Sequence, residues 1–476
     1  MASKDTPAPP YYNIDPARAA AKLAAPVTTT RFAKAANFAA KGRDDLAKRG
    51  YAPDGMKRLR KFSTWEICKY LIPLAPAHFR RVLKQHDHLP QGSGEGGTKW
   101  FTLEEVMALR QHFATEGSAD REYLPYRPEG LPAKVIGVAN FKGGVGKTST
   151  CAHLAMSAAL DGYKVLVIDL DSQGSMTSIM GGKVADEWQT AFPLIAKHFA
   201  GHLLAENSVL AAGGFATKPL DETLQAALEI GADDVIQSTH WPNIDLIGAQ
   251  LNLYWAEFQV PVWRMQLRSW PLWDALGGFL EDEGLLDRYD LIFLDTPPAL
   301  GYLTINALSA ADILLVPLGA SFLEFDSTGR FFDMLYSTFA SIEDGENSSR
   351  AGAGLEEIRF EWDAVRAMIT RFDPAQQTDL ANVVQAYFGD FMTTYRQEFT
   401  AMVGQAGEQV SGIYEADYRD FNRDTYTRGR ETFDRTWAEV KEIIQGCWWR
   451  DLHMQGQTQD QTDGQHQATD AAVTEE

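Results

Sequence analysis

The sequence contains few cysteines, and their spacing matches no common metal or disulfide motif. The chain of 476 residues has three, Cys68, Cys151 and Cys447, which lie far apart. The odd count and the absence of a CxxC pair predict reduced thiols and no zinc site. Reduced thiols fit a protein of the cytosol rather than a disulfide-linked secreted fold.

Long apolar segments are also missing. No run of about 20 apolar residues occurs, so the sequence predicts no membrane span. The N-terminal segment MASKDTPAPPYYNID lacks the short apolar core of a secretory signal. Apolar residues nevertheless make up 45% of the chain and charged residues 23%, ordinary values for a globular protein. The length allows two folded units with sizeable cores, and we expect them in the cytoplasm.

The chain as a whole lacks a net positive charge, which is the simplest sequence indication of a nucleic-acid-binding protein. Its formal net charge is -20. Residues 1–130, however, hold 21 Lys and Arg against 14 Asp and Glu, a local net charge of +7, and the remainder has a net charge of -27. Such asymmetry can mark a basic DNA-contacting unit joined to an acidic one, but it is equally compatible with an ordinary solvated surface.

Both ends of the chain are expected to be extensions. Residues 1–55 are rich in Ala, and the stretches Pro16–Leu23 and Thr30–Lys41 can form helices within an otherwise flexible segment. Residues 454–476 contain no aromatic residue and are dominated by Gln, Asp and Thr. An acidic, Gln-rich tail of this kind is predicted to be disordered.

Residues 56–122 predict a compact helical domain. A Ser-Thr pair can cap a helix through TWEICKYL, and a second helix, AHFRRVLKQH, begins near Pro76. The Gly-rich segment LPQGSGEGGTKWF then predicts a turn or wing, and a capping box of Thr102 and Glu105 opens a third helix, LEEVMALRQHF. This order of elements is what a small winged or MerR-like helix-turn-helix DNA-binding domain needs.

Residues 123–132 hold three prolines and predict a stiff linker, and a different pattern fills residues 133–453. There, short runs rich in Val, Ile and Leu alternate with helical stretches. The runs that predict strands are Lys134–Ala139, Lys164–Leu170, Ile244–Ile247, Leu291–Leu294, Ile313–Val316 and Val365–Ile369. Near-continuous apolar strands alternating with helices predict an α/β fold, with a mostly parallel, doubly wound sheet covered on both faces.

The most specific local signal follows the first of these strands. KVIGVANFKGGVGKTST places a strand, a Gly-rich loop and a helix start in consecutive order, which predicts a P-loop NTPase. The glycines let backbone N–H groups turn toward one point, and the positive end of the helix dipole adds to their attraction for phosphate. Lys147 is expected on the β- and γ-phosphates of ATP, and the Thr148 hydroxyl on Mg²⁺. The expected nucleotide-binding segment is Lys142, Gly143, Gly144, Val145, Gly146, Lys147, Thr148 and Ser149.

This loop departs from the usual GxxxxGK[ST] pattern, because Phe141 takes the first glycine position and Lys142 follows it in KGGVGKT. In this respect it resembles the deviant-Walker ATPases, which include the ParA and MinD proteins, the nitrogenase iron protein and arsenite pumps. The resemblance implies an ATP-dependent homodimer in which Lys142 reaches across to the phosphates of the partner. That lysine would stabilise transition-state charge only when two subunits meet.

Two acidic motifs resemble the remaining parts of this family's site. VLVIDLDSQGS is a buried strand that ends in Asp169 and Asp171, and DLIFLDTPP is a second one that ends in Asp295. The resemblance implies that Asp171 positions the attacking water, that Asp169 supports the metal shell and that Asp295 holds Mg²⁺. The carboxyl ends of parallel strands are where such sheets bind ligands. Thr370 and Arg371, in TRFDPAQQT, resemble the family's region near the adenine.

Within the family, the sequence favours the ParA type. Its acidic tail differs from the basic amphipathic membrane helix of MinD-type proteins, and the cysteines of a nitrogenase-type cluster are absent. The segments RKFSTWEICKYLIPLAPAHFRR, YRPEGLPAKVIGVANFKGGVGKTSTCAHLA, DLDSQGSMTSI and IYEADYRDFNRDTYTRGRETFDRTW resemble the RepA partition proteins of repABC-type plasmids. The resemblance implies segregation of plasmid copies with a ParB-like centromere-binding protein and repression of the chain's own operon. It also implies binding to operator DNA and non-specific chromosomal DNA, hence association with the nucleoid and no membrane partner.

Two groups of basic residues are candidates for the DNA contacts. Those on the second helix of the N-terminal domain, expected at the operator, are Arg80, Arg81 and Lys84. Those for sequence-independent contacts, with acidic residues interleaved, are Arg419, Arg423, Arg428 and Arg430. Two other functions stay open: a DNA-binding transcriptional regulator with a vestigial nucleotide site, and a ParA-like protein that positions another cargo, such as a chemoreceptor cluster or a carboxysome. The intact Walker residues argue against the first, and the N-terminal domain argues against the second.

Overall fold

The computed structural model of the chain describes residues 29–48, 57–94, 99–116, 123–184 and 186–473. The chain divides into two compact units, Met1–Gly55 and Met56–Glu476. The first unit contributes one described helix, α2 (Thr29–Lys48), which confirms and extends the helix expected at Thr30–Lys41. The helix expected at Pro16–Leu23 lies outside the described residues.

The second unit begins with the small helical segment that the sequence predicts. Its elements are β1 (Phe62–Ser63), α3 (Thr64–Glu66), the π-helix η1 (Ile67–Leu71), α4 (Pro76–Gln85), β2 (Trp100–Phe101) and α5 (Leu103–Glu116). Side chains of Ser63 and Glu66 form a capping box at α3, and those of Thr102 and Glu105 form the expected one at α5. Strands β1 and β2 pair antiparallel on either side of the Gly-rich segment. The expected order of elements is therefore present.

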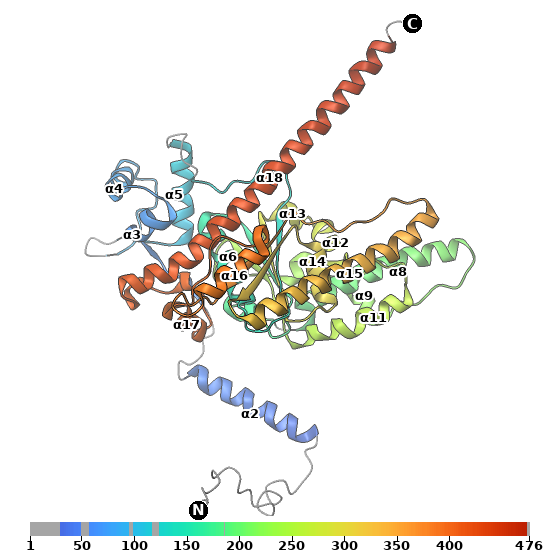
Figure 1. The fold of residues 1–476 in the computed structure, drawn as a ribbon, viewed down its shortest axis with the longest axis horizontal. Coiled ribbons are helices and arrows are strands. Elements are labelled where there is room, and N and C mark those ends of the chain that lie inside the picture. Colours follow the sequence, from blue (N-terminus) through green and yellow to red (C-terminus); the bar gives the residue numbers. More distant parts are fainter. Residues whose placement is uncertain (1–28, 49–56, 95–98, 117–122, 185, 474–476) are drawn as a thin grey trace, which may run out of the picture. The chain divides into compact units, whose positions relative to one another are not determined.

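A seven-stranded sheet forms the centre of the second unit (Figure 1). Its strands are β3 (Lys134–Val138), β4 (Val165–Asp169), β5 (Ile236–Ser238), β6 (Ile244–Ile247), β7 (Leu291–Asp295), β8 (Ile313–Gly319) and β9 (Ala364–Thr370). Their order is β5-β6-β4-β7-β3-β8-β9, and every pairing is parallel except that of β5 with β6. All six predicted strands are confirmed. The edge strand β5 escaped prediction because IQS is too short to show an apolar pattern.

Helices cover both faces of this sheet. In chain order they are α6 (Lys147–Asp161), α7 (Ser175–Ile179), η2 (Glu187–Gln189), α8 (Phe192–Ala212), α9 (Glu222–Leu228), α10 (Ala232–Val235), η3 (Leu251–Trp255), α11 (Ala256–Gln266), α12 (Ala275–Asp282), α13 (Leu285–Arg288), α14 (Tyr302–Ala310), α15 (Phe322–Ala353), α16 (Thr378–Phe388), η4 (Gly389–Phe391), α17 (Ala401–Glu408), η5 (Ile413–Glu415), η6 (Tyr418–Asp420) and α18 (Arg423–Val473). In Figure 1, α3, α4 and α5 lie at one end of this unit, and α8, α9 and α11 lie at the other.

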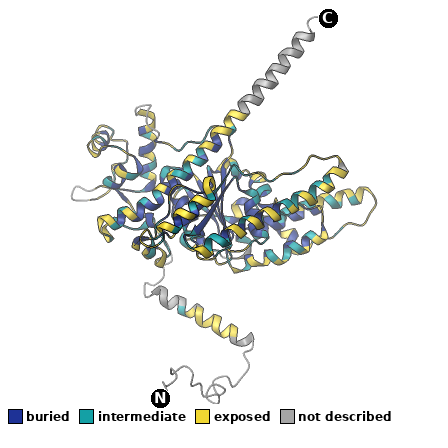
Figure 2. Ribbon diagram, viewed as in Figure 1, coloured by how far each residue is buried: buried dark blue, intermediate teal, exposed yellow. Residues whose placement is uncertain are grey.

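Alternate strand residues point to opposite faces of the sheet, and each face has its own core. Val167 and Phe293 belong to a buried cluster that also contains residues of α6, α18 and the N-terminal helical segment. Ile168 and Leu294, their neighbours in sequence, belong to a second cluster with residues of α8, α12 and α14. Strands β3, β4 and β7, at the centre of the sheet, are accordingly buried along their whole length (Figure 2). This explains why they appear in the sequence as near-continuous apolar runs.

The N-terminal helical segment shares a core with the sheet. Phe79 and Phe101 are fully buried in the same cluster as Val167. Arg110 on α5 is also buried, and it donates a hydrogen bond to the Leu160 carbonyl oxygen at the end of α6 (2.9 Å). The elements from β1 to α5 are therefore packed against the rest of the second unit.

Residues 123–132 do not separate two independent bodies, although their prolines predict a linker. Tyr123 and Leu131 are buried. Arg127 donates a hydrogen bond to the Tyr289 carbonyl oxygen (2.7 Å), just before β7. The prolines correctly indicate a stiff segment. Its attachment to the sheet could not be predicted, because it depends on side-chain contacts with residues far along the chain.

Helix α18 continues to Val473 and so extends into the segment for which the sequence predicts disorder. Its earlier turns are packed, with Trp437 and Trp448 buried. A helix that is already formed extends without the cost of a new nucleus. The tail also contains no proline, and Gln and Ala are good helix formers. The prediction of disorder rested on the polar composition of the tail alone. It did not consider that the packed part of α18 could continue into the tail as a helix.

Candidate functional site

The loop between β3 and α6 has the backbone shape of a phosphate-binding loop. Gly144 and Gly146 have positive φ angles of 78° and 87°, a conformation that other residues rarely adopt. Gly146 is the N-cap of α6, so the free N–H groups of the first helical turn and the positive end of the helix dipole lie at the loop. Gly143 and Gly144 are exposed. The loop is therefore open to an anionic ligand.

Asn140, which the sequence did not single out, anchors the start of the loop. Its Nδ2 donates to the Pro317 carbonyl oxygen on β8 (2.7 Å), and its Oδ1 accepts from the Lys142 N–H (3.1 Å). These two partners are backbone groups, and Nδ2 also donates to the Thr328 hydroxyl (3.4 Å), so Asn140 fixes the path of the chain. The sequence could have indicated this role of Asn140 only through its position, one residue after the predicted apolar strand.

Thr370 and Arg371, predicted near the adenine, hold the loop from the end of β9. The buried Thr370 hydroxyl donates to the Val145 carbonyl oxygen (2.6 Å), and Arg371 donates to that of Gly144 (2.6 Å). Arg371 has a positive φ of 52°, which is uncommon for a residue with a side chain. The structure thus brings both predicted residues to the loop, where their observed contacts are with its backbone.

The two lysines of the loop have different surroundings. Lys147 is buried, and its ammonium lies 3.4 Å from the Lys142 carbonyl oxygen. Burial lowers the pKa of Lys147, and the carboxylates of Asp295 and Asp171 oppose that shift. The Lys142 side chain is half-buried and forms no ion pair with any described residue. The Lys147 ammonium therefore lies inside the site, whereas the Lys142 ammonium is free to pair with an anionic group of another molecule.

Asp169 and Asp295 lie side by side at the carboxyl edge of the sheet. They end β4 and β7 and are paired in the register of these strands. Both are fully buried. Asp169 accepts hydrogen bonds from the N–H and the hydroxyl of Thr177 (2.8 and 2.7 Å) and from the N–H of Asp171 (3.1 Å). It therefore positions the turn that carries Asp171.

The electrostatics of this pair favour a cation. Burial raises the pKa of Asp295 well above its ordinary value, and the charge of Asp169 raises it further. Burial likewise raises the pKa of Asp169, to about 7. Neither oxygen of Asp295 has a well-formed hydrogen bond to a described residue, although the Thr148 hydroxyl is near enough to lower its pKa. Carboxylate and hydroxyl oxygens are ligands that Mg²⁺ prefers, so Thr148 and Asp295 fit that ion.

The remaining predicted residues surround this pair. Asp171 is half-buried, and its Oδ1 accepts a hydrogen bond from the Gln173 N–H (3.0 Å). Its charge acts on both Lys147 and Asp295. Ser149, in the first turn of α6, is half-buried. One edge of the sheet thus brings together Lys142, Lys147, Thr148, Asp169, Asp171 and Asp295.

A buried histidine that the sequence did not single out couples α6 to the C-terminal helices. His153 donates from Nδ1 to the Ser149 carbonyl oxygen (2.6 Å) and accepts at Nε2 from the Ile413 N–H (3.0 Å). Its ring stacks on that of Phe433 in α18, with centroids 3.9 Å apart. One partner only accepts and the other only donates, so the imidazole must be neutral. Because Ile413 and Phe433 are far from His153 in the chain, no local sequence pattern could have predicted this role.

The neutral state of His153 predicts a loss of stability in mild acid. Burial lowers the pKa of His153 to about 4, from an ordinary value of 6.5. Between these values the unfolded chain binds a proton and the folded chain does not, so the stabilising contribution is complete above 6.5 and falls as the pH drops toward 4. We expect the free energy of unfolding to drop by roughly 2 kcal/mol between about pH 7.5 and pH 5 on this account.

Urea unfolding of the wild type and of His153→Gln at both pH values measures this contribution. The variant is expected to be less stable at neutral pH and to show a smaller pH dependence, because glutamine does not titrate. His453→Gln, which changes an exposed histidine on α18, is the matched control. An unchanged pH dependence in His153→Gln would contradict the assignment.

The three basic residues predicted at the operator share one exposed helix face. Arg80, Arg81 and Lys84 of α4 are exposed, whereas Phe79 and Val82 on the opposite side are buried. None of the three cations forms an ion pair with a described residue. This face of α4 therefore presents uncompensated positive charge to solvent.

The C-terminal arginines are less available. Arg419 is exposed but paired with Asp417, and Arg428 is paired with Glu398 (3.1 Å between nitrogen and oxygen). Arg423 is exposed at the start of α18. Asp417 and Glu398 thus compensate two of these charges directly.

The prediction that Arg430 contacts DNA has to be corrected, because Arg430 is not a surface residue. It is buried, pairs with Asp434 (3.1 Å) and places its guanidinium 4.1 Å from the centre of the Tyr70 ring. Helical spacing puts it on the same face of α18 as Phe433 and Trp437, which are also buried. Arg430 therefore joins α18 to the N-terminal helical segment, and DNA cannot contact it.

Comparison with known proteins places this site in a wider context. A family model described as an AAA domain matches residues 133–348. Two proteins, both named "Putative replication protein A", resemble nearly the whole chain. The one from Sinorhizobium fredii is 31% identical over 85% of this chain and 91% of its own length, and the one from Rhizobium rhizogenes is 29% identical over 84% and 90%.

The fold also matches a solved structure. A protein titled "Partition Protein" superposes with a TM-score of 0.54 at 18% identity and covers 87% of this chain and 98% of its own. At that identity the match concerns the fold alone. Among the described residues, no helix is both long and apolar enough to cross a membrane.

Proposed function

The chain belongs to the ParA-type family of deviant-Walker partition ATPases, and from this premise we propose that it is an ATP-hydrolysing switch that segregates plasmid copies. ATP and Mg²⁺ are the cofactors of this family. One observation carries the proposal: a glycine loop with two lysines lies beside two buried aspartates at the carboxyl edge of a parallel sheet. Such an arrangement suits binding and hydrolysis of a nucleoside triphosphate.

Within one subunit, each residue has a distinct task. Backbone N–H groups of the loop and the Lys147 ammonium bind the β- and γ-phosphates, while Thr148 and Asp295 hold Mg²⁺. When bound, that ion supplies positive charge at the phosphate oxygens. Asp171 orients the attacking water, and Asp169 fixes Asp171 through the hydrogen bond to its N–H. Thr370 and Arg371 keep the loop in shape at the nucleotide. Positioning and electrostatics carry phosphoryl transfer, so no nucleophilic side chain is required.

The second subunit completes the site. ATP closes a homodimer in which Lys142 of each subunit reaches the phosphates held by the other. The absence of an ion pair on Lys142 among the described residues supports this use of its charge. A single subunit lacks that charge at the transition state, so hydrolysis is slow until two subunits meet.

The cycle then acts on DNA in the cytoplasm, at the nucleoid. The ATP-bound dimer binds non-specific chromosomal DNA through phosphate contacts, for which Arg423 and, after exchange of their partners, Arg419 and Arg428 are candidates. A ParB-like centromere-binding protein stimulates hydrolysis and releases the dimer. Operator binding through α4 represses the chain's own operon. The net charge of +7 in residues 1–130 supports such a DNA contact.

ATP hydrolysis by the purified chain tests the proposal. Turnover is expected to be slow for the chain alone and to rise when non-specific duplex DNA and the cognate ParB-like protein are both added. No turnover in any condition, with operator binding preserved, would indicate a DNA-binding regulator with a vestigial nucleotide site. Stimulation only by a component of another cargo would indicate a positioning protein of a different kind.

The exposed face of α4 predicts a salt-dependent operator contact. The triple variant Arg80→Ala, Arg81→Ala and Lys84→Ala is expected to bind duplex DNA from upstream of its own gene at least about tenfold more weakly. Each lost phosphate contact removes about 0.9 from the slope of log affinity against log salt concentration, so the slope should fall by up to about 3. Fluorescence anisotropy across a salt series measures both quantities.

A triple variant of exposed cations elsewhere, Lys183→Ala, Arg268→Ala and Arg359→Ala, is the matched control and should bind as the wild type does. Point variants are preferable to deletion of residues 1–130, because that deletion would remove part of a shared core. An unchanged salt slope in the α4 variant would refute its role at the operator.

A further inference from the structure

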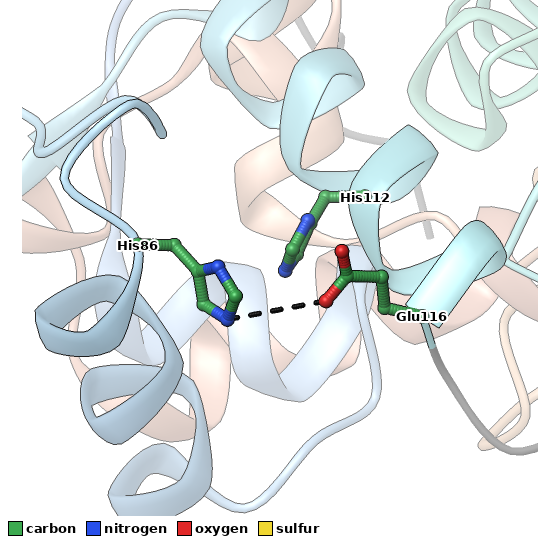
Figure 3. Close-up of side chains that lie close together, drawn as sticks. All are labelled: His86, His112 and Glu116. Atoms are coloured by element: carbon green, nitrogen blue, oxygen red, sulfur yellow. Dashed lines mark ion pairs between the residues drawn. The ribbon is translucent and has the colours of Figure 1, made fainter.

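A cluster of histidines lies outside the nucleotide site, where α4 and α5 end. Figure 3 shows the side chains of His86, His112 and Glu116 turned toward one another. Their nitrogen and carboxylate oxygen atoms all lie within 4.8 Å of one another, and His86 Nε2 is 4.0 Å from Glu116 Oε2. The ring centroid of His88 is 5.7 Å from that of His86 and 6.0 Å from that of His112. No other group of three potential metal ligands among the described residues is gathered this closely.

We propose that this cluster is a zinc site, with His86, His112 and Glu116 as ligands and His88 as the candidate fourth. Two imidazole nitrogens with a carboxylate suit Zn²⁺, whereas Mg²⁺ prefers oxygen ligands alone. The cysteines of the chain predicted no zinc site, but this site requires none of them.

The geometry needs only a small closure. Bonds of about 2.0–2.2 Å in a tetrahedron place neighbouring ligand atoms about 3.3–3.5 Å apart. The side chains therefore have to close by about 1 Å from their present separations. His86 and Glu116 have the freedom to do so, since their side chains are 30% and 59% exposed. His112 and Glu116 are one turn apart on α5, so they already share a helix face.

The backbone around the cluster independently favours a cation. His86 is the C-cap of α4, and Glu116 is the last residue of α5. The negative end of the α4 dipole therefore lies where the side chains converge. This field and the Glu116 carboxylate offset the repulsion from Lys84, which lies in the last turn of α4.

A bound ion would tie the end of α4 to the end of α5. Because α4 carries Arg80, Arg81 and Lys84, occupancy would restrict the orientation of the helix that we propose at the operator. This consequence rests on the proposed function, but binding of the ion does not. Zinc binding and DNA binding can therefore be tested, and can fail, separately.

Zinc titration of the full chain, without a histidine tag and after chelator treatment, tests the site. Excess Mg²⁺ and ADP occupy the nucleotide site throughout. Competition with a chromophoric chelator should show one zinc ion per chain, and Co²⁺ in its place should give a visible absorption band typical of tetrahedral nitrogen and oxygen ligation. The double variant His86→Gln and His112→Gln, and separately Glu116→Gln, should bind zinc at least about tenfold more weakly.

The matched control is the double variant His202→Gln and His453→Gln, which removes two histidines outside the cluster and should leave zinc binding unchanged. Nucleotide binding, measured on every variant, verifies that the fold is intact. Zinc affinity that survives in both cluster variants, or that is lost in the control, would overturn the proposal, as would failure of the wild type to bind zinc.

Discussion

Lys147→Ala is expected to reduce ATP turnover at least about a hundredfold, both for the chain alone and with DNA and the partner protein. The buried Lys147 ammonium contacts the loop backbone and feels the charges of Asp171 and Asp295, so it is placed to meet the β- and γ-phosphates. Without it, the negative charge of the phosphates faces buried acids with no fixed cation from the protein. The loss should therefore appear in nucleotide binding as well as in turnover.

Phosphate release, measured with a coupled assay, and binding of a fluorescent ATP analogue provide the two readouts. Lys183→Ala, which removes an exposed lysine far along the chain, is the matched control and should match the wild type. Burial lowers the pKa of Lys147, so its charge contributes no stability that the fold requires, and the variant should remain folded. Turnover near the wild-type rate in Lys147→Ala would mean that the loop is not the hydrolytic site.

Lys142→Ala is expected to separate nucleotide binding from catalysis. Its side chain forms no ion pair with a described residue, and the loop is anchored through the Lys142 N–H instead. ATP should therefore still bind to the single subunit. Dimer formation with ATP should be lost, and turnover stimulated by DNA and partner should fall about a thousandfold, as for other residues that supply charge in trans.

Light scattering on a sizing column with a non-hydrolysable ATP analogue measures the dimer, and the same phosphate-release assay measures turnover. Lys142→Arg retains the charge and should recover part of both effects, which alanine cannot. If Lys142→Ala formed the dimer and hydrolysed ATP as the wild type does, Lys142 would be an ordinary surface lysine and the cross-subunit proposal would fail.

Several features could be predicted because their signals are local. Strands buried on both faces appear as short apolar runs, so all six predicted strands are found. The loop could be assigned because Gly144 and Gly146 adopt positive φ next to a helix start, and a short sequence motif records both glycines directly. The capping box of Thr102 with Glu105, three residues later, was equally visible, and the cap at Ser63 was one of the two that the sequence offered.

Other features depend on contacts between distant parts of the chain. Arg430 and the exposed arginines look alike in sequence, and only the packing of α18 against Tyr70 separates them. Residues 454–476 are polar in sequence, yet α18 continues as far as Val473. His153 was missed because the groups that complete its hydrogen bonds and ring stacking, Ile413 and Phe433, come from other elements.

The sequence by itself determined the sheet, the phosphate loop and the identity of the acids and lysines around it, since strand periodicity, glycine φ angles and helix caps are properties of neighbouring residues. Only the tertiary structure decided that Asp169 and Asp295 lie in register, that the elements from β1 to α5 share a core with the sheet, and that His86 and His112 meet. Those relations arise from strand pairing and helix packing, which bring together residues that no local pattern connects.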